Sequence, residues 1–183
     1  FKRFLSYLPN KQNILLDFGC GDGIYSKEIL SHKKIKLIYM TDKNKKLRLF
    51  IKKKYRNNKK VIWTDTLHKR YKVVLLNSVS QYLKIIEYKT LIKFFFSKKV
   101  NIIVISDIPK YPRIVESFIL LLTNPIHLLM GLSYLRNKNY LKMGYHFKNK
   151  ETLKIKNNDY SYAVVDNLTS NLFSRYTMVI KKK

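Results

Sequence analysis

Three glycines that follow an acid are the strongest chemical signal in this sequence. Asp17 stands near the end of a short apolar run, and Gly19, Gly21 and Gly23 follow at every second position. Glycine adopts backbone conformations that other residues avoid, and it leaves bare backbone for a ligand to approach. The segment 24–30 is predicted to be a helix, whose free N–H groups and positive dipole end would face the same place. A strand, a glycine turn and a helix in this order predict a nucleotide-binding corner.

Two further acids, Asp42 and Asp65, close later apolar runs that are predicted strands. In nucleotide-binding βαβ units, an acid at such a strand end accepts hydrogen bonds from the ribose hydroxyls. Asp42 could instead cap the helix predicted from Lys43, since aspartate is a favoured capping residue. Asp65 could be a turn residue, and Asp17 could simply cap the glycine turn. The residue types therefore leave a ligand role and a structural role open for each acid.

An alternation of strands and helices positions these acids. The predicted strands are 13–18, 36–42, 61–65, 71–78 and 100–107, and the predicted helices are 1–8, 24–30, 43–55 and 87–97. The gap between the third and fourth strands holds at most one helical turn, so the crossover helix is shortened or lost there. Strands that alternate with helices predict an α/β fold with a doubly wound, mostly parallel sheet and helices on both faces.

The pattern changes after Pro109. Residues 113–135 are strongly apolar, but Pro125 and several polar residues interrupt them. A membrane span needs about 20 uninterrupted apolar residues, so two packed or lid helices are predicted instead. The remaining predicted elements are a short polar helix at 148–156 and an antiparallel hairpin of strands 159–166 and 172–180 at the sheet edge. We therefore expect one domain over 1–183, with an apolar lid or insert at about 110–147.

The net charge of +27 favours a nucleic-acid or anionic-membrane partner. The lysines are scattered over nearly every segment, however, and Lys, Asn, Ile, Tyr and Phe are abundant together, as A/T-rich codons produce. A purely compositional origin of the charge therefore stays open. Cys20 is the single cysteine, which excludes an internal disulfide and a multi-cysteine zinc site. Since the N-terminus also lacks the features of a signal peptide, we expect a reducing, cytoplasmic setting and no metal.

Residues 16–23 resemble the acid-x-Gly-x-Gly-x-Gly signature of the class I S-adenosylmethionine-dependent methyltransferases. The resemblance extends to both later strand-end acids, to 71–79 as the fourth-strand motif and to the terminal hairpin. It covers about 13–180, except for 110–144. A nicotinamide Rossmann fingerprint would need glycine where Ile24 stands. The resemblance implies a Rossmann-like fold and S-adenosyl-L-methionine as cofactor.

The resemblance also implies roles for single residues. The glycine turn would let the backbone approach the methionyl portion and the ribose, and Asp17 would orient the turn and the ligand's amino group. Asp42 would accept hydrogen bonds from both ribose hydroxyls, and Asp65 would bind the adenine amine. The candidate cofactor-binding residues are Asp17, Gly19, Cys20, Gly21, Gly23, Asp42, Asp65, Thr66, Asn77 and Ser78.

The acceptor must be argued from the segment outside the resemblance. The apolar run 113–135 favours a small-molecule or lipid-like acceptor, and beside abundant lysine it favours peripheral contact with an anionic membrane. His146 lies in a place similar to that where the lid of many small-molecule methyltransferases returns to the active site, which makes it the candidate catalytic base.

Two alternatives stay open. Charge and aromatic content favour an RNA methyltransferase. Against this alternative, the sequence contains no appended RNA-binding module, and Asn77-Ser78-Val79-Ser80 replaces the Asn/Asp-Pro-Pro-Tyr motif of amino-group nucleic-acid methyltransferases. The other alternative is a non-catalytic basic binding module on the same fold, because a fold does not by itself establish an activity.

Overall fold

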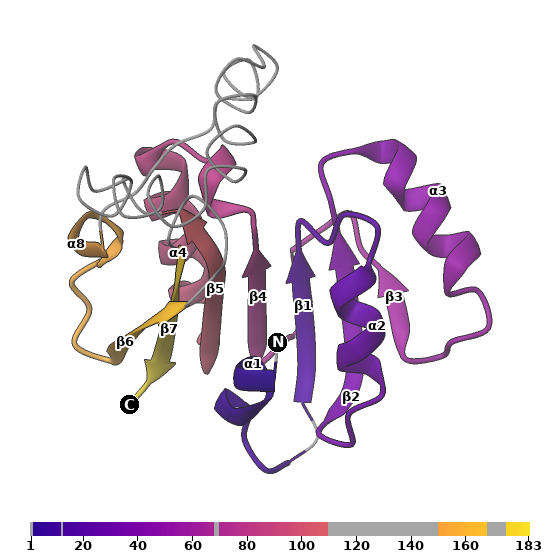
Figure 1. Ribbon diagram of the computed structural model, residues 1–183, viewed down its shortest axis with the longest axis horizontal. Coiled ribbons are helices and arrows are strands. Elements are labelled where there is room, and N and C mark those ends of the chain that lie inside the picture. Colours follow the sequence, from indigo (N-terminus) through magenta and orange to yellow (C-terminus); the bar gives the residue numbers. More distant parts are fainter. Residues whose placement is uncertain (1, 12, 68–69, 110–149, 168–174) are drawn as a thin grey trace, which may run out of the picture.

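The computed structural model describes residues 2–11, 13–67, 70–109, 150–167 and 175–183. A seven-stranded sheet with the order β3-β2-β1-β4-β5-β7-β6 runs through this part of the chain (Figure 1). Its strands are β1 (Asn13–Phe18), β2 (Ile35–Thr41), β3 (Val61–Trp63), β4 (Val73–Asn77), β5 (Ile102–Pro109), β6 (Tyr160–Asn167) and β7 (Arg175–Lys182). The helices are α1 (Lys2–Tyr7), α2 (Ile24–Leu30), α3 (Lys45–Lys54), the short 3-10 helix η1 (Ser80–Tyr82), α4 (Ile85–Ser97) and α8 (Lys150–Leu153).

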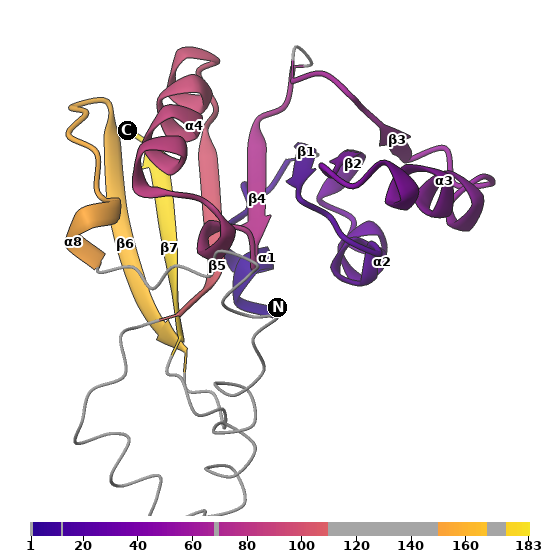
Figure 2. The ribbon, with the colours of Figure 1, turned by 90° about the horizontal axis from the view of Figure 1, so that it is seen from above.

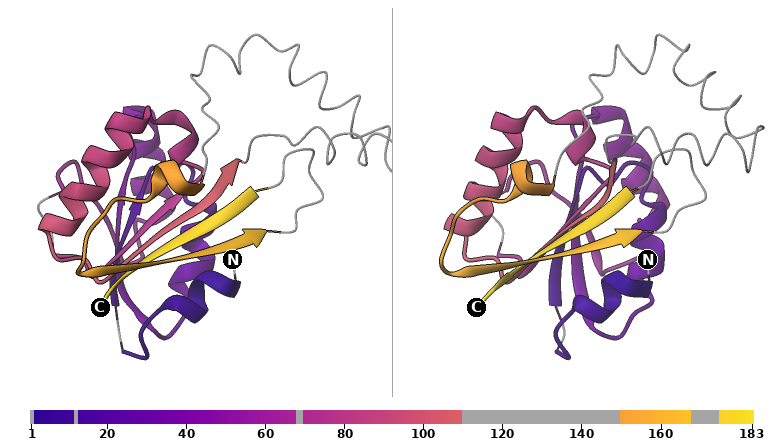
Figure 3. Two further views of the ribbon diagram at one scale, coloured as in Figure 1. Left: turned by 90° about the vertical axis from the view of Figure 1, so that its left-hand side faces the viewer. Right: turned by 60° about the vertical axis from the view of Figure 1, so that its left-hand side comes forward.

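The first five strands are parallel. β1 pairs with β2 and β4, and β3 and β5 extend the sheet on either side. β7 is antiparallel to β5, and β6 is antiparallel to β7 at the edge, where Figure 3 shows the two strands side by side. The predicted α/β class, the mostly parallel sheet and the terminal hairpin are confirmed. Because the parallel strands share one direction, their carboxyl ends meet at one edge of the sheet.

Helices cover both faces of the sheet, as predicted. Figure 2 shows α4 on one side of the strands and α2 with α3 on the other. Consecutive strand residues supply the two apolar layers, because side chains alternate between the faces of a strand. Leu15 packs in the layer beneath α2 and α3, whereas Leu16 packs in the layer beneath α4. Strands buried on both faces are continuously apolar, which is the pattern that made them recognisable in the sequence.

Some element ends differ from the prediction. The third strand ends at Trp63 rather than at Asp65, so this acid lies in the following turn. The helix after the fourth strand begins at Ile85 rather than at Glu87. The Glu87 carboxylate accepts a hydrogen bond from the backbone N–H of Lys84 at 2.6 Å, which stabilises an earlier first turn.

The predicted lid at 110–147, its two apolar helices and His146 lie outside the described residues. Within the part of the chain that the structure describes, no helix has the length and apolar character needed to cross a membrane. The described residues between β3 and β4 contain no helix, in line with the short crossover expected there.

Candidate ligand-binding site

The glycine turn is held against the end of the neighbouring strand. Gly19, Gly21 and Gly23 have φ angles of 73°, 55° and 71°, in the left-handed region that glycine occupies without strain. The backbone N–H groups of Gly19 and Cys20 donate to the carbonyl of Thr41 at 2.8 and 3.1 Å. The end of β1 and the end of β2 are therefore joined, and the turn between β1 and α2 has a defined position.

The three glycines have different surroundings. A Cβ on Gly19 would lie 2.5 Å from Cγ2 of Val79, and one on Gly23 would lie 2.9 Å from Cδ1 of Ile51. A Cβ on Gly21 would meet nothing within 4 Å. Gly19 and Gly23 are therefore required by packing as well as by conformation. Gly21 instead presents its backbone to open space, where a ligand can approach it.

Asp42 binds the glycine turn directly. Its Oδ2 accepts a hydrogen bond from the N–H of Gly21 at 3.1 Å, and its Oδ1 accepts one from the N–H of Asn44 at 2.9 Å. The cap of α3 is Asn44, whose side chain accepts a hydrogen bond from the N–H of Lys46 at 3.0 Å. The alternative that Asp42 is the helix cap is therefore wrong. Each carboxylate oxygen of Asp42 keeps a lone pair for a ligand hydroxyl.

Asp17 lies below the turn, in the protein interior. Its side chain is 3% exposed, and its carboxylate accepts a hydrogen bond from the hydroxyl of Ser26 in α2. Burial raises the pKa of Asp17 to about 6; the hydrogen bond from Ser26 opposes this shift, and the nearby charge of Asp42 adds to it. The contact joins β1 to α2 beneath the turn, so Asp17 supports the turn from below.

The raised pKa of Asp17 predicts a specific dependence of stability on pH. Between about pH 4 and pH 6 the native acid is protonated while the unfolded acid is ionised, so the free energy of unfolding should fall as pH rises. The loss should reach roughly 3 kcal/mol by pH 7, since each pKa unit corresponds to about 1.4 kcal/mol. Urea unfolding of the native protein and of Asp17→Asn at pH 4.5 and pH 7 measures the loss of unfolding free energy that is due to Asp17. Parallel pH dependences in the two proteins would contradict it.

Asp65 has partners that sequence reasoning missed. Its Oδ2 lies 2.7 Å from a guanidinium nitrogen of Arg48 in α3, and its Oδ1 accepts a hydrogen bond from the indole N–H of Trp63 at 2.8 Å. Thr66 is exposed, and its carbonyl accepts a hydrogen bond from the Thr64 hydroxyl at 2.6 Å. The side chain of Asp65 thus connects α3 to the end of β3. A ligand amine would have to share this carboxylate with two protein donors.

A second polar cluster lies at the ends of β4, β5 and β7. Ser106 donates to the side-chain oxygen of Asn77 at 2.6 Å, and the hydroxyl of Ser78 donates to the carboxylate of Asp107. A guanidinium nitrogen of Arg175 lies 2.7 Å from the same carboxylate. Ser78 and Asp107 have φ angles of 55° and 62°, and such conformations in residues other than glycine occur preferentially at functional sites. Asn77 and Ser78 of this cluster were candidates from the sequence, whereas Arg175, which comes from β7, was not.

Packing brings the two clusters together. Val79 follows the second cluster directly in the chain and lies against Gly19 of the glycine turn. The strand order reverses between β1 and β4, and ligands of open α/β sheets bind in the crevice at such a reversal. The structure thus gathers the glycine turn, Asp42 and the Asn77–Ser78 pair at one edge of the sheet.

Comparison with known proteins identifies the fold. No protein-family model matches the sequence, and no curated protein matches it. The structure is similar to magnesium protoporphyrin IX methyltransferase from Synechocystis PCC 6803 with bound SAH, with a TM-score of 0.66 and 16% identity over 99% of this chain and 78% of that one. It is also similar to the N-methyltransferase NodS from Bradyrhizobium japonicum WM9 in complex with S-adenosylhomocysteine, with a TM-score of 0.62 and 9% identity over 94% and 79% of the two chains. A chain of the Pnkp1/Rnl/Hen1 RNA repair complex gives a TM-score of 0.61 and 13% identity over 99% of this chain and 40% of that one.

The chain has the class I methyltransferase fold. The expectation from the glycine signature is thereby confirmed at the level of the fold. On this methyltransferase fold the Gly19–Gly23 turn stands at the carboxyl end of the first strand, beside the reversal of strand order.

Cys20, a further candidate of the turn, donates its backbone N–H to the carbonyl of Thr41 and its thiol to the carbonyl of Gly21 at 3.8 Å. The side chain is buried, and burial raises the pKa of the thiol, with the charges of Asp17 and Asp42 acting in the same direction. The raised pKa keeps the thiol protonated near neutral pH. Among the described residues, no group of three or more His, Cys, Asp or Glu side chains could hold a metal ion.

Proposed function

We propose that this protein is an S-adenosylmethionine-dependent methyltransferase. The proposal is carried by the 3.1 Å hydrogen bond from the Gly21 N–H to the Asp42 carboxylate at the reversal of strand order. This contact supports a site in which one carboxylate lies beside bare backbone. A ribose needs such a carboxylate for its two hydroxyls, and the adjoining methionyl portion needs the space that Gly21 leaves open.

The residues present fit this cofactor. Asp42 would hold the ribose, the turn from Gly19 to Gly23 would lie along the methionyl portion, and Asn77 with Ser78 would line the methyl-donor side. When bound, S-adenosylmethionine supplies an electrophilic methyl carbon on a positively charged sulfur. The chain's own contribution is to position the acceptor and to exclude water. The defined conformation of the turn and the hydrogen bonds around Asp107 support such positioning.

We further propose a small-molecule or lipid-like acceptor. The apolar run 113–135 supports this choice, because an apolar segment suits a small or lipid-like acceptor. His146 stays the candidate base. The second candidate function is RNA methylation, which the net charge of +27 and the similarity to a chain of an RNA repair complex favour. The third is a basic binding module without catalysis.

Calorimetric titration with S-adenosylmethionine and S-adenosylhomocysteine tests the proposal. We expect micromolar binding of both compounds and none of a nicotinamide dinucleotide. A folded sample that binds neither S-adenosyl compound would refute the enzyme proposal and leave the non-catalytic module. Once binding is established, methyl transfer to small metabolites and lipids can be compared with transfer to RNA. RNA binding carried by phosphate contacts should weaken steeply as salt rises.

A further inference from the structure

The outer surface of α3 is strongly basic. Ten of the 18 residues from 43 to 60 are Lys or Arg, and none is Asp or Glu. Arg48 forms an ion pair with Asp65. The five lysines of α3, by contrast, form no ion pair with any acid in the described parts of the chain. These lysines are Lys45, Lys46, Lys52, Lys53 and Lys54. The absence of acidic partners leaves their positive charges uncompensated, although Lys54 Nζ also donates to the carbonyl of Asp22.

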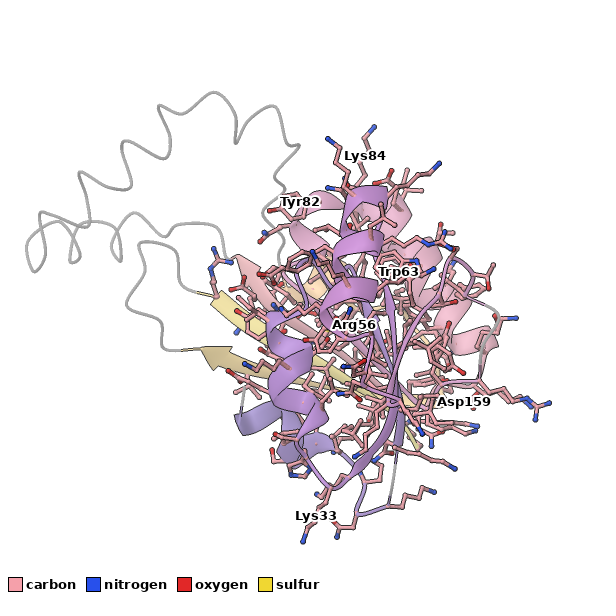
Figure 4. All side chains as sticks on the ribbon, turned by 90° about the vertical axis from the view of Figure 1, so that its right-hand side faces the viewer. Lys33, Arg56, Trp63, Tyr82, Lys84 and Asp159 are labelled. Carbon is pink, nitrogen blue, oxygen red and sulfur yellow. The ribbon has the colours of Figure 1, made fainter. Side chains whose placement is uncertain are left out.

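Large apolar side chains lie among these lysines. Leu49 is 72% exposed and Phe50 is 49% exposed, whereas Ile51, the next residue, is buried against the sheet. Lys54 Nζ lies 5.5 Å from the centre of the Phe50 ring. We call Leu49, Phe50 and the five lysines the α3 surface. Figure 4 views the molecule from this side, with Arg56 labelled just beyond the end of α3.

Two more exposed apolar residues, Ile24 and Tyr25, stand at the start of α2. The loop that precedes them is bonded to the end of α3. Lys54 Nζ donates to the carbonyl of Asp22 at 2.7 Å, and the hydroxyl of Tyr55 donates to the carbonyl of Gly23 at 2.8 Å. The apolar residues of α2 therefore begin next to the α3 surface.

We propose that the α3 surface docks on an anionic lipid bilayer. Lysines attract the phosphates of anionic headgroups, while exposed leucine and phenylalanine gain free energy by entering the acyl boundary. This combination distinguishes a bilayer from RNA, whose phosphates would use the lysines but would leave Leu49 without an apolar partner. The charge of the surface and its apolar centre complement the two layers of a bilayer interface.

Docking through α3 would hold the glycine turn close to the bilayer, because Lys54 and Tyr55 are bonded to the turn. A lipid-like acceptor would then be presented beside the candidate cofactor site. Docking itself needs neither cofactor nor methyl transfer. Vesicle binding and cofactor binding are therefore separate measurements, and failure of one leaves the other standing.

Vesicle sedimentation of the full chain tests the proposal. With a net charge of +27, the protein should bind anionic vesicles at low salt wherever its lysines lie. The informative comparison is therefore at about 0.15 M salt, where charge attraction between exposed groups is screened beyond about 8 Å. Phosphatidylcholine vesicles containing phosphatidylglycerol should still bind the protein there, and pure phosphatidylcholine vesicles should bind it far more weakly.

A matched pair of double variants separates insertion from general charge. Leu49→Ser with Phe50→Ser should lower the partition coefficient at this salt concentration by at least about tenfold, since each side chain loses its apolar burial. The control is Ile85→Ser with Ile86→Ser on α4, another adjacent apolar pair, of which Ile86 is 76% exposed. The control should retain vesicle binding within about twofold, because it replaces the same number of apolar residues by serine but does so on α4, on the opposite face of the sheet from α3. Equal losses in the two double variants would overturn the proposal.

Fluorescence locates the inserted residue. Trp63 is the only tryptophan, so a Trp63→Phe background carrying Leu49→Trp gives one reporter on α3. Its emission should shift to the blue on vesicles and should be quenched by brominated acyl chains, whereas Ile86→Trp in the same background should show neither change. Lack of quenching at position 49 would overturn the proposal. The proposal would also be overturned if the Leu49/Phe50 double variant bound vesicles normally but lost RNA binding. The same holds if that variant bound vesicles normally but lost a dimer seen in sedimentation velocity.

Discussion

Replacing Asp42 by alanine should lower the affinity for S-adenosylmethionine by at least about 100-fold in a protein that remains folded. The proposed ribose contacts use both carboxylate oxygens, and a hydrogen bond to a charged group contributes roughly 1.5–3 kcal/mol. The same substitution removes the acceptor for the N–H of Gly21 at 3.1 Å and thus loosens the turn on which the cofactor would lie. Calorimetric titration of the native protein and the variant measures the effect.

Two further variants control for charge and for folding. Asp159→Ala removes an exposed acid at the start of β6 (labelled in Figure 4) and should leave the affinity unchanged. Asp42→Asn keeps one oxygen acceptor and should fall between the native protein and Asp42→Ala. If Asp42→Ala had native circular dichroism and native affinity for S-adenosylmethionine, the proposal that this carboxylate binds the ribose would be contradicted.

Gly19→Ala should mainly lower the stability of the protein, whereas Gly21→Ala should mainly lower its affinity for the cofactor. Gly19→Ala should destabilise the protein by about 2–5 kcal/mol, because a left-handed alanine costs about 1–2 kcal/mol and overpacking costs about 1–3 kcal/mol. The overpacking arises because the new Cβ would lie 2.5 Å from Val79 Cγ2. Gly21→Ala meets no atom within 4 Å, so only the conformational cost applies. Its methyl group would instead occupy the space proposed for the ligand and lower cofactor affinity about tenfold or more.

Urea unfolding and calorimetric titration of both variants separate these effects. A double-mutant cycle tests the packing part of the Gly19→Ala destabilisation. Val79→Ala makes room for the new methyl group, so it should reduce the free energy of unfolding less in the Gly19→Ala background than in the native protein. The coupling should be about 1 kcal/mol or more, as is usual for residues in direct contact. Additive effects would show that Gly19 is needed for its conformation alone. If Gly21→Ala bound the cofactor normally, the ligand would not approach the turn there.

The sequence alone determined the architecture because its signals are local. Continuous apolar runs marked strands that are buried on both faces, and glycines at every second position marked the turn after β1. The sequence marked Asp42 as a strand-end acid that would bind the ribose hydroxyls, and the structure places its carboxylate 3.1 Å from the N–H of Gly21 in the glycine turn. Parallel pairing makes such a prediction possible, because it sends successive strand ends to one edge of the sheet.

Tertiary structure decided which partner each polar group takes. The sequence could not choose between Asp42 and Asn44 as the cap of α3, since both residue types cap helices. It also could not pair Asp107 with Arg175, because these residues are 68 positions apart and meet only where β5 and β7 are antiparallel neighbours. The contact of Asp65 with Arg48 likewise depends on how α3 lies against β3.

The physical reason for this division is the range of the interactions. Residue type and spacing set backbone conformation and burial, which depend on neighbours along the chain. Hydrogen bonds and ion pairs between side chains form only after strand order and helix packing have placed distant segments side by side. The helices α2 and α3 cover one face of the sheet, and α4 covers the other. The exposed Leu49 and Phe50 on α3 are a product of the same packing, which used one side of the helix for the core and left the other to the surroundings.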